Sequence, residues 1–257
     1  MRIAALQMRA VAGDPAANLA RIERAAVEAA AAGAVLLIAP ELAVTGYGAG
    51  EAIRDLAEGA DGPAVARLAA IAAEAGVSIV SGIAERAGDA VYNSAVLVDD
   101  TGSRLVYRKS HLYGPYERTL FRPGPAAAAT AEIAGVKVGL LICYDVEFPE
   151  NVRRLAQERV DLVIVPTALP ATGHGAFIAE KMVPVRAFEN QLFVAYVNHC
   201  GADERFAYAG LSAIVAPDGT MLAQAGAAEE ALLVADIDPA AFAASRAANT
   251  YLDDLRS

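Results

Sequence analysis

Three residues that could carry out chemistry each follow an apolar run, and the first of them is Cys143. Residues 138–142 form an apolar, β-branched run typical of a buried strand, and Cys143 comes directly after it. Residues 145–149 are typical of a helix start, with acidic side chains in the first turn. A cysteine facing a helix N-terminus lies among backbone N–H groups that favour its thiolate. A buried structural cysteine is the alternative interpretation of this residue taken alone.

Glu41 and Lys109 occupy equivalent positions after two other predicted strands. Glu41 follows the run 34–38, and Lys109 ends the run 104–109. A partly desolvated glutamate can accept the thiol proton. A lysine beside a carboxylate stays protonated, so Lys109 is suited to stabilising an oxyanion, with the backbone N–H of Tyr144 as second donor. Glu41, Lys109 and Cys143 therefore form a predicted catalytic set for amide cleavage through a thioester.

The elements that must position these residues alternate between strands and helices, but several strand pairs are predicted hairpins. We predict strands over residues 3–8, 34–38, 77–83, 90–98, 104–109, 131–134, 136–142, 162–166, 192–197, 207–215, 220–224 and 231–237. We predict helices between Asp14 and Gly33, between Gly62 and Gly76, and over 148–158, 176–189 and 239–248. This pattern indicates an α/β fold with mixed sheets. No linker divides residues 1–257, so we expect a single domain.

Three segments lie outside these elements. The glycine-rich stretch 45–50 lacks a phosphate-binding fingerprint and is predicted to be a mobile loop near the site. Residues 110–125 are predicted to form a long functional loop, because they combine aromatic and charged side chains. Residues 249–257 are predicted to be a tail that needs a surface to pack on.

The composition excludes several classes of function. The chain has 257 residues, of which 56% are hydrophobic, and its formal net charge is −10, which disfavours nucleic acid and anionic membranes as partners. Two cysteines in this length favour a reducing compartment, and neither a signal peptide nor a membrane-spanning stretch is visible, so we expect a soluble cytoplasmic protein. We find no metal-ligand spacing, and the scattered histidines are predicted to be ordinary loop or core residues. These are His111, His174 and His199.

The three motifs together resemble the carbon–nitrogen hydrolases of the nitrilase superfamily. The motifs are Pro40-Glu41-Leu42, Tyr107-Arg108-Lys109-Ser110-His111-Leu112 and Cys143-Tyr144-Asp145-Val146-Glu147-Phe148-Pro149-Glu150, in the order of that family. The likeness extends from about residue 3 to about residue 237. It implies a four-layer α-β-β-α sandwich and a homodimer or larger even-numbered assembly, with the C-terminal tail packing on a partner. No cofactor and no metal are implied.

The resemblance also implies further site residues. The fourth acid of the family, in the segment after the lysine, matches Glu117. We predict that it orients Lys109 or the substrate amide nitrogen and is not the proton acceptor. Four more residues are predicted to bind substrate or the oxyanion. These are Tyr144, Tyr116, Thr167 and Ala168.

The acyl group varies within the resembled family, so the substrate is less defined than the chemistry. Family members that act on carboxylate-bearing substrates commonly carry arginine where this chain has Val146 and Glu147. Glu147 is predicted either to cap the following helix or to contact a substrate amine. We therefore expect an amidase that releases ammonia from a small primary amide. An N-carbamoyl amine hydrolase and a nitrilase remain alternatives, and a catalytically idle scaffold is disfavoured because all four site residues are present.

Overall fold

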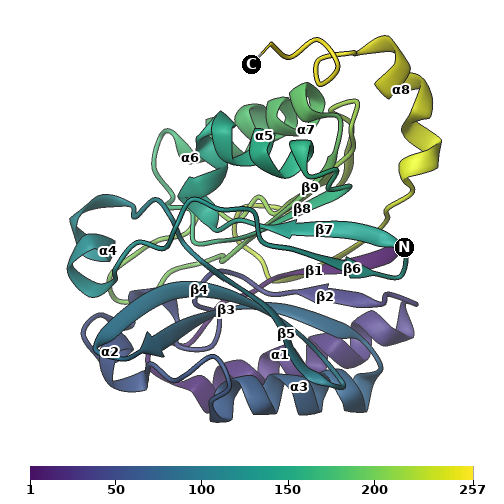
Figure 1. Cartoon of the computed structure of the whole chain (residues 1–257). Helices are drawn as coiled ribbons and strands as arrows, with labels where there is room; N and C mark the ends of the chain where they lie inside the picture. The colour runs from purple at the N-terminus through teal and green to yellow at the C-terminus, as the bar shows by residue number, and fades with distance from the viewer. Residues whose placement is uncertain (257) are drawn as a thin grey trace.

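Two β-sheets pack face to face in the centre of the molecule, and helices cover the outer face of each sheet (Figure 1). The computed structural model describes residues 1–256. The four layers and the mixed sheets confirm the predicted α/β sandwich.

Each sheet has six strands and the same pattern of strand directions. The first sheet contains, in spatial order, β12 (Ala231–Asp236), β1 (Arg2–Gln7), β2 (Leu36–Ile38), β3 (Ser78–Ala87), β4 (Ala90–Asp99) and β5 (Gly102–Arg108). The second contains β11 (Met221–Gln224), β10 (Ala213–Val215), β9 (Phe193–Asn198), β8 (Leu162–Thr167), β7 (Val136–Leu140) and β6 (Thr130–Ile133). Strands β1, β2 and β3 are parallel to one another, as are β7, β8 and β9, and the remaining pairings are antiparallel. Strands that run in the same direction end at the same edge of their sheet, and the predicted site residues lie just beyond these strand ends.

Four main helices form the outer layers. Helices α1 (Pro15–Ala31) and α3 (Pro63–Ala75) cover the first sheet, while α5 (Pro149–Gln157) and α7 (Val183–Asn190) cover the second (Figure 1). Shorter helices are α2 (Ala52–Leu56), α4 (Gly114–Leu120), α6 (Gly175–Phe177) and α8 (Ala243–Ala248). Within residues 1–256, no helix combines the length and the apolar character that crossing a membrane would require.

Alternating side chains along the central strands build two separate cores. Ile3 and Ala5 of β1 belong to the core between the sheets, whereas Ala4 belongs to the core beneath α1 and α3. Strand β2 divides in the same way, with Leu36 and Ile38 on one side and Leu37 on the other. These strands are therefore buried on both faces, which explains their nearly continuous apolar sequence.

The predicted helix ends are confirmed where the local signal was strong. The Asp14 side chain accepts a hydrogen bond from the N–H of Ala17 at 2.9 Å and caps α1. Pro63 occupies the first turn of α3, and Gly76 ends that helix in the left-handed conformation at φ 70°.

Three predicted elements differ from the structure. The segment 110–125 contains helix α4, so the prediction of an uninterrupted loop was wrong. The predicted strand 207–215 is ordered as a strand only over Ala213–Val215, because the residues before it make isolated bridges and bonds to loops. The predicted helix 176–189 consists of α6, a π-helical turn at Ile178–Met182 and α7.

The C-terminal segment, drawn in yellow, runs past α5 and α7 after α8 (Figure 1). The ring of Tyr251 lies 5.9 Å from that of Phe188, so this segment touches α7 of its own subunit. Tyr251 and Leu255 remain 46% and 44% exposed. Packing of residues 249–257 on a partner stays a prediction, and Ser257 lies outside the described residues.

Candidate active site

Glu41 is held at the end of β2 by a tightly packed turn. Leu42, the next residue, adopts a positive φ of 49°, and the backbone of Gly82 packs directly against this turn. The carbonyl oxygen of Glu41 accepts a hydrogen bond from His199 Nε2 at 2.7 Å. The main chain of Glu41 is therefore fixed from two sides before its side chain makes any contact.

Lys109 follows β5 and is anchored through its own backbone. Its N–H donates to the carbonyl of Asn93, and its carbonyl accepts from the N–H of Gly124, each at 2.8 Å. The preceding residue, Arg108, donates from Nε to Glu85 at 2.9 Å. The lysine side chain can therefore extend into the space between the sheets from a fixed origin.

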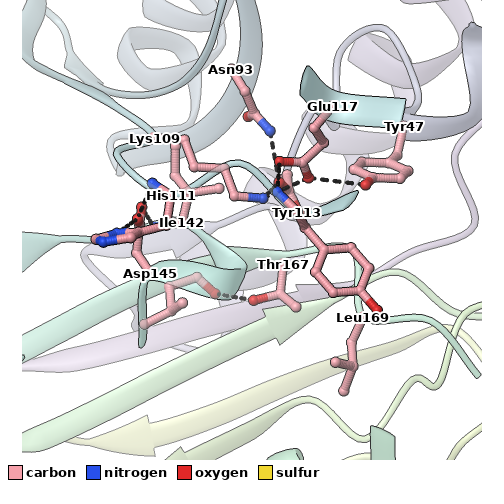
Figure 2. A network of polar contacts seen from close by, with 12 residues as sticks. Tyr47, Asn93, Lys109, His111, Tyr113, Glu117, Ile142, Asp145, Thr167 and Leu169 are labelled. Carbon is pink, nitrogen blue, oxygen red and sulfur yellow. Dashed lines mark hydrogen bonds and ion pairs between the residues drawn. The ribbon is translucent and has the colours of Figure 1, made fainter. Parts of the chain in front are cut away.

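The lysine joins two buried carboxylates (Figure 2). Lys109 Nζ lies 2.6 Å from Glu41 Oε1 and 2.6 Å from Glu117 Oε1, and all three side chains are buried. Asn93 Nδ2 donates to Glu41 Oε1 at 2.7 Å, and the Tyr47 hydroxyl donates to Glu117 Oε1 at 2.9 Å. The remaining carboxylate oxygens of the two acids differ in their contacts.

Glu117 Oε2 accepts the N–H of Tyr113 at 2.8 Å, whereas Glu41 Oε2 is buried without a hydrogen-bond partner. Buried carboxylate oxygens normally have a partner, so this unpaired oxygen is available to a proton or a ligand. The structure thus brings Glu41, Lys109 and Glu117 together. Glu117 lies on α4, so the prediction that it sits in an irregular loop was wrong.

Burial and the neighbouring charges shift the pKa values of Lys109 and Glu117. Burial alone would lower the pKa of Lys109, but the charges of Glu117 and Glu41 outweigh it and hold that pKa well above its usual value. Burial raises the pKa of Glu117, and Lys109 opposes the shift. These charges favour the ammonium form of Lys109, which is the form that its predicted oxyanion role requires.

Cys143 begins a 3₁₀ turn, η2 (Cys143–Glu147), and adopts a positive φ of 45°. Helix α5 begins at Pro149, in agreement with the helix predicted over 148–158, but residues 145–147, which were expected to start it, belong to the 3₁₀ turn. Burial and the Glu41 carboxylate raise the pKa of the Cys143 thiol well above its usual value. A thiolate favoured by a helix N-terminus is not supported, because burial raises the pKa of the thiol and the element that begins at Cys143 is a short 3₁₀ turn, not an α-helix. The thiol needs a base.

Asp145 fixes the turn that carries the cysteine (Figure 2). Its carboxylate accepts bonds from the Tyr107 hydroxyl at 2.9 Å, the Ser110 hydroxyl at 2.8 Å and the N–H of His111 at 2.8 Å. The N–H of Ile142 donates to the same carboxylate at 3.3 Å. Asp145 thus joins the segment after Lys109 to the segment before Cys143.

The four predicted binding residues lie in different environments. The hydroxyl of Tyr116 is occupied by the N–H of Gly50 and the carbonyl of Tyr47, so this residue orders the 47–50 segment. Tyr144 is half-buried, and its ring packs edge-on against Tyr113. Thr167 and Ala168 are buried at the end of β8, and the backbone N–H of Ala168 lowers the pKa of the Cys143 thiol, against the larger effect of burial.

Residues 45–50, predicted as a mobile loop, carry a side chain that sequence reasoning missed. Tyr47 lies in the 3₁₀ turn η1 (Tyr47–Ala49), is 4% exposed and bonds to Glu117. The glycines around it were the only sequence signal that this segment approaches the site. Among residues 1–256, no group of three or more His, Cys, Asp or Glu side chains is arranged to hold a metal ion.

Comparisons with known proteins define the class to which this fold and site belong. The sequence model of the carbon–nitrogen hydrolase family matches residues 2–247, so the chain belongs to that family. It is an amidase-like carbon–nitrogen hydrolase of the nitrilase superfamily.

Individual relatives span the whole chain. It is 45% identical to a hydrolase encoded in the pqqF 5′ region of Pseudomonas protegens, over 100% of this chain and 89% of the relative. It is 38% identical to an (R)-stereoselective amidase of a Pseudomonas species, over 100% of this chain and 92% of the relative. The solved NitN amidase of Nesterenkonia sp. AN1 is 36% identical over 100% of this chain and 96% of that chain, with a TM-score of 0.89. Structures of that amidase include an acrylamide adduct at its active-site cysteine and a variant in complex with butyramide.

Proposed function

We propose that the protein hydrolyses small primary amides to a carboxylate and ammonia through a thioester on Cys143. The observation that supports this proposal is that Glu41 and Lys109, although both buried, each have hydrogen-bonding capacity that no protein group takes up. Glu41 keeps one oxygen without a partner, and Lys109 donates to two carboxylate oxygens. Because an ammonium has three N–H donors, one remains for a substrate oxygen.

In the first half-reaction, Glu41 Oε2 accepts the thiol proton while Cys143 Sγ bonds to the amide carbonyl carbon. The carbonyl π electrons move to oxygen, where the third N–H of Lys109 and the backbone N–H of Tyr144 stabilise the oxyanion. When the carbon–nitrogen bond breaks, Glu41 returns its proton to the nitrogen, and ammonia leaves. The acyl group remains as a thioester.

In the second half-reaction, Glu41 takes a proton from water as the water oxygen bonds to the thioester carbonyl carbon. The carbon–sulfur bond breaks, and the sulfur recovers the proton from Glu41. Glu117 positions Lys109 throughout and transfers no proton. Tyr116, Thr167 and Ala168 line the acyl side of the site in this proposal.

The substrate class is a neutral or amine-bearing amide. The positions where carboxylate-binding relatives commonly carry arginine hold Val146 and Glu147, and the chain has a net charge of −10. Anionic substrates are disfavoured both in the site and on approach. The complex of butyramide with a variant of the Nesterenkonia amidase supports a small uncharged amide as the simplest substrate of this class.

Ammonia release from matched amides, N-carbamoyl amines and nitriles tests this proposal. We expect neutral and amine-bearing primary amides to exceed their carboxylate-bearing analogues in kcat/KM by at least about tenfold, and nitriles to be slower still. A preference for a dicarboxylate-derived amide would contradict the proposed substrate class. A preference for N-carbamoyl amines or nitriles would replace the amidase assignment.

We also propose that residues 1–257 act as one domain in an even-numbered homo-oligomer in the cytoplasm. The exposed apolar or aromatic side chains include Phe177 of α6 at 59%, Val185 of α7 at 50% and Tyr251 of the C-terminal segment at 46%. Light scattering of the full chain and of a chain ending at Ala248 measures the assembly. A monomeric full chain would contradict this proposal.

A further inference from the structure

Glu147 has a carboxylate for which neither the fold nor the proposed reaction has a use. It is the last residue of η2, four positions after Cys143, and its side chain is half-buried. Within residues 1–256 its carboxylate takes part in no hydrogen bond or ion pair. The N-cap of α5 is Phe148, and no side chain caps that helix. The interpretation of Glu147 as a helix cap is therefore not supported by the contacts.

The neighbouring arginine leaves this carboxylate unpaired. Arg186 of α7 donates to the carbonyls of Val146 and Glu147 at 2.9 and 2.8 Å, and to the Glu189 carboxylate at 2.9 Å. The guanidinium thus fixes the main chain of η2 while its charge is matched by Glu189. Arg186 therefore fixes the backbone of Glu147, while the Glu147 carboxylate remains able to bind a cation other than Arg186.

The charges that act on Glu147 come mainly from the active site. Burial raises the pKa of Glu147, and Lys109 opposes that shift more strongly than Arg186 does. The hydroxyl of Tyr196 is buried without a hydrogen-bond partner, and burial together with the Glu147 carboxylate raises its pKa. The Glu147 carboxyl is therefore within electrostatic range of Lys109, and it lies four positions from Cys143 in the same 3₁₀ turn.

We propose that Glu147 is a specificity-determining residue whose carboxylate binds a cationic amine on the acyl part of the substrate. This inference rests on the proposed amidase function. A half-buried carboxylate without a partner is unfavourable, and a substrate ammonium would supply both the charge and the N–H donors that it lacks. The preferred substrates are then primary amides of amino acids that carry the free amine away from the carboxamide.

Pairs of amides that differ only by an ammonium in place of a methyl group test this inference. The pairs are 3-aminopropanamide with butyramide, 4-aminobutanamide with pentanamide, and 5-aminopentanamide with hexanamide. Ammonia release is measured for the full-length wild type, for Glu147→Gln, which keeps the shape and removes the charge, and for Glu150→Gln. Glu150 is an exposed acid in the first turn of α5, so its substitution removes an equal charge from the same stretch of chain.

We expect wild type to prefer the amine in at least one pair, and Glu147→Gln to lower that preference by about tenfold, with the neutral amide changed less than about threefold. Glu150→Gln should keep the wild-type preference. An unchanged preference in Glu147→Gln would overturn the inference, and so would an equal loss on both members of a pair, because that loss would indicate a role in the general machinery. Failure of wild type to hydrolyse any of these six amides would instead contradict the proposed amidase function.

Discussion

Glu41 and Lys109 form a fully buried ion pair, with 2.6 Å between Glu41 Oε1 and Lys109 Nζ. The pair is asymmetric, because Asn93 and Lys109 both bond to Oε1 while Oε2 has no partner. The same carboxylate can therefore hold the lysine through one oxygen and exchange a proton through the other. Breaking such a buried pair leaves an uncompensated charge, so each partner should be sensitive to substitution.

Cys143→Ala should abolish turnover and leave the fold intact. No other side chain in the proposed site can form the thioester, and alanine fits a position that is 7% exposed. Cys200→Ala is the matched control, because Cys200 is the second free cysteine and should leave the rate near wild type. Ammonia release and circular dichroism are the measurements. Substantial turnover by Cys143→Ala would end the covalent proposal.

Glu117→Gln should reduce kcat by roughly 10²–10⁴, the range for a lost electrostatic or proton-transfer contribution. The amide keeps the shape of the side chain and removes one of the two charges that hold Lys109. Thioester formation should become less productive, because the lysine and the thiol then meet the substrate in a different geometry. Glu132→Gln is the control, because Glu132 is the exposed residue of β6. A Glu117→Gln enzyme with wild-type kcat would show that this acid is a bystander.

Tyr47→Phe should lower kcat by about tenfold, less than Glu117→Gln. The hydroxyl donates to Glu117 Oε1 at 2.9 Å, and a hydrogen bond to a charged group contributes roughly 1.5 kcal/mol or more. Phenylalanine keeps the ring contacts with Tyr116 and Phe206, which lie 5.4 and 5.3 Å away. Steady-state kinetics test this, with Tyr251→Phe as the control for loss of a hydroxyl on an exposed ring. A rate equal to that of Tyr251→Phe would show that Glu117 does not depend on Tyr47.

Gly82→Ala should destabilise the fold and reduce activity together. A methyl group at this position would lie 2.1 Å from the backbone nitrogen of Leu42 and 2.5 Å from the carbonyl oxygen of Pro40. Since both atoms belong to the turn that carries Glu41, the catalytic carboxylate must move. We expect a loss of several kcal/mol, about 3 or more, as for other forced overpacking. Gly173→Ala, which meets no atom within 4 Å, is the control, and equal melting temperatures for the two variants would contradict this account.

The preference for amine-bearing amides should depend on pH through Glu147. Burial raises the pKa of this carboxyl, so it becomes protonated at a higher pH than an ordinary glutamate. Its charge, and with it the preference, should be complete above that raised pKa and disappear as the pH falls through it. The ratio of kcat/KM for 5-aminopentanamide to that for hexanamide, measured between about pH 5 and 8, reports this change. The ratio should stay flat in Glu147→Gln, and a flat wild-type ratio would contradict the assignment.

The residues themselves predicted an α/β fold with mixed sheets and the strand-end positions of Glu41 and Lys109, because local signals determine those features. The four-layer sandwich and the place of Glu117 in the site were implied by the resemblance to the nitrilase superfamily. Apolar runs mark strands, and a charged residue directly after a strand must lie at its end. Asp14, Pro63 and Gly76 marked helix boundaries through backbone chemistry that acts within a few residues. Helix α4 was missed because it has only seven residues and begins with Gly114 and Pro115, which usually indicate a turn.

The remaining features depend on contacts between distant parts of the chain. The hydrogen bond between Tyr47 and Glu117 joins residues 70 positions apart, and the one between His199 and Glu41 joins residues 158 positions apart. No local sequence pattern can predict either of them. The state of the Cys143 thiol was mispredicted for a related reason. Its pKa is set by burial between the two sheets and by the Glu41 charge, and neither is visible in the residues next to it.

The proposed nucleophile and its proposed base follow strands of different sheets. Cys143 follows β7 of the second sheet, while Glu41 and Lys109 follow β2 and β5 of the first. The distance between thiol and carboxylate is therefore set by how the two sheets sit on each other, through interior side chains such as Ile38 and Leu140. A substitution that shifts this interface by a fraction of an ångström can slow proton transfer while the melting temperature barely changes. Catalytic rate should therefore report a change in the alignment of the two sheets more sensitively than thermal stability does.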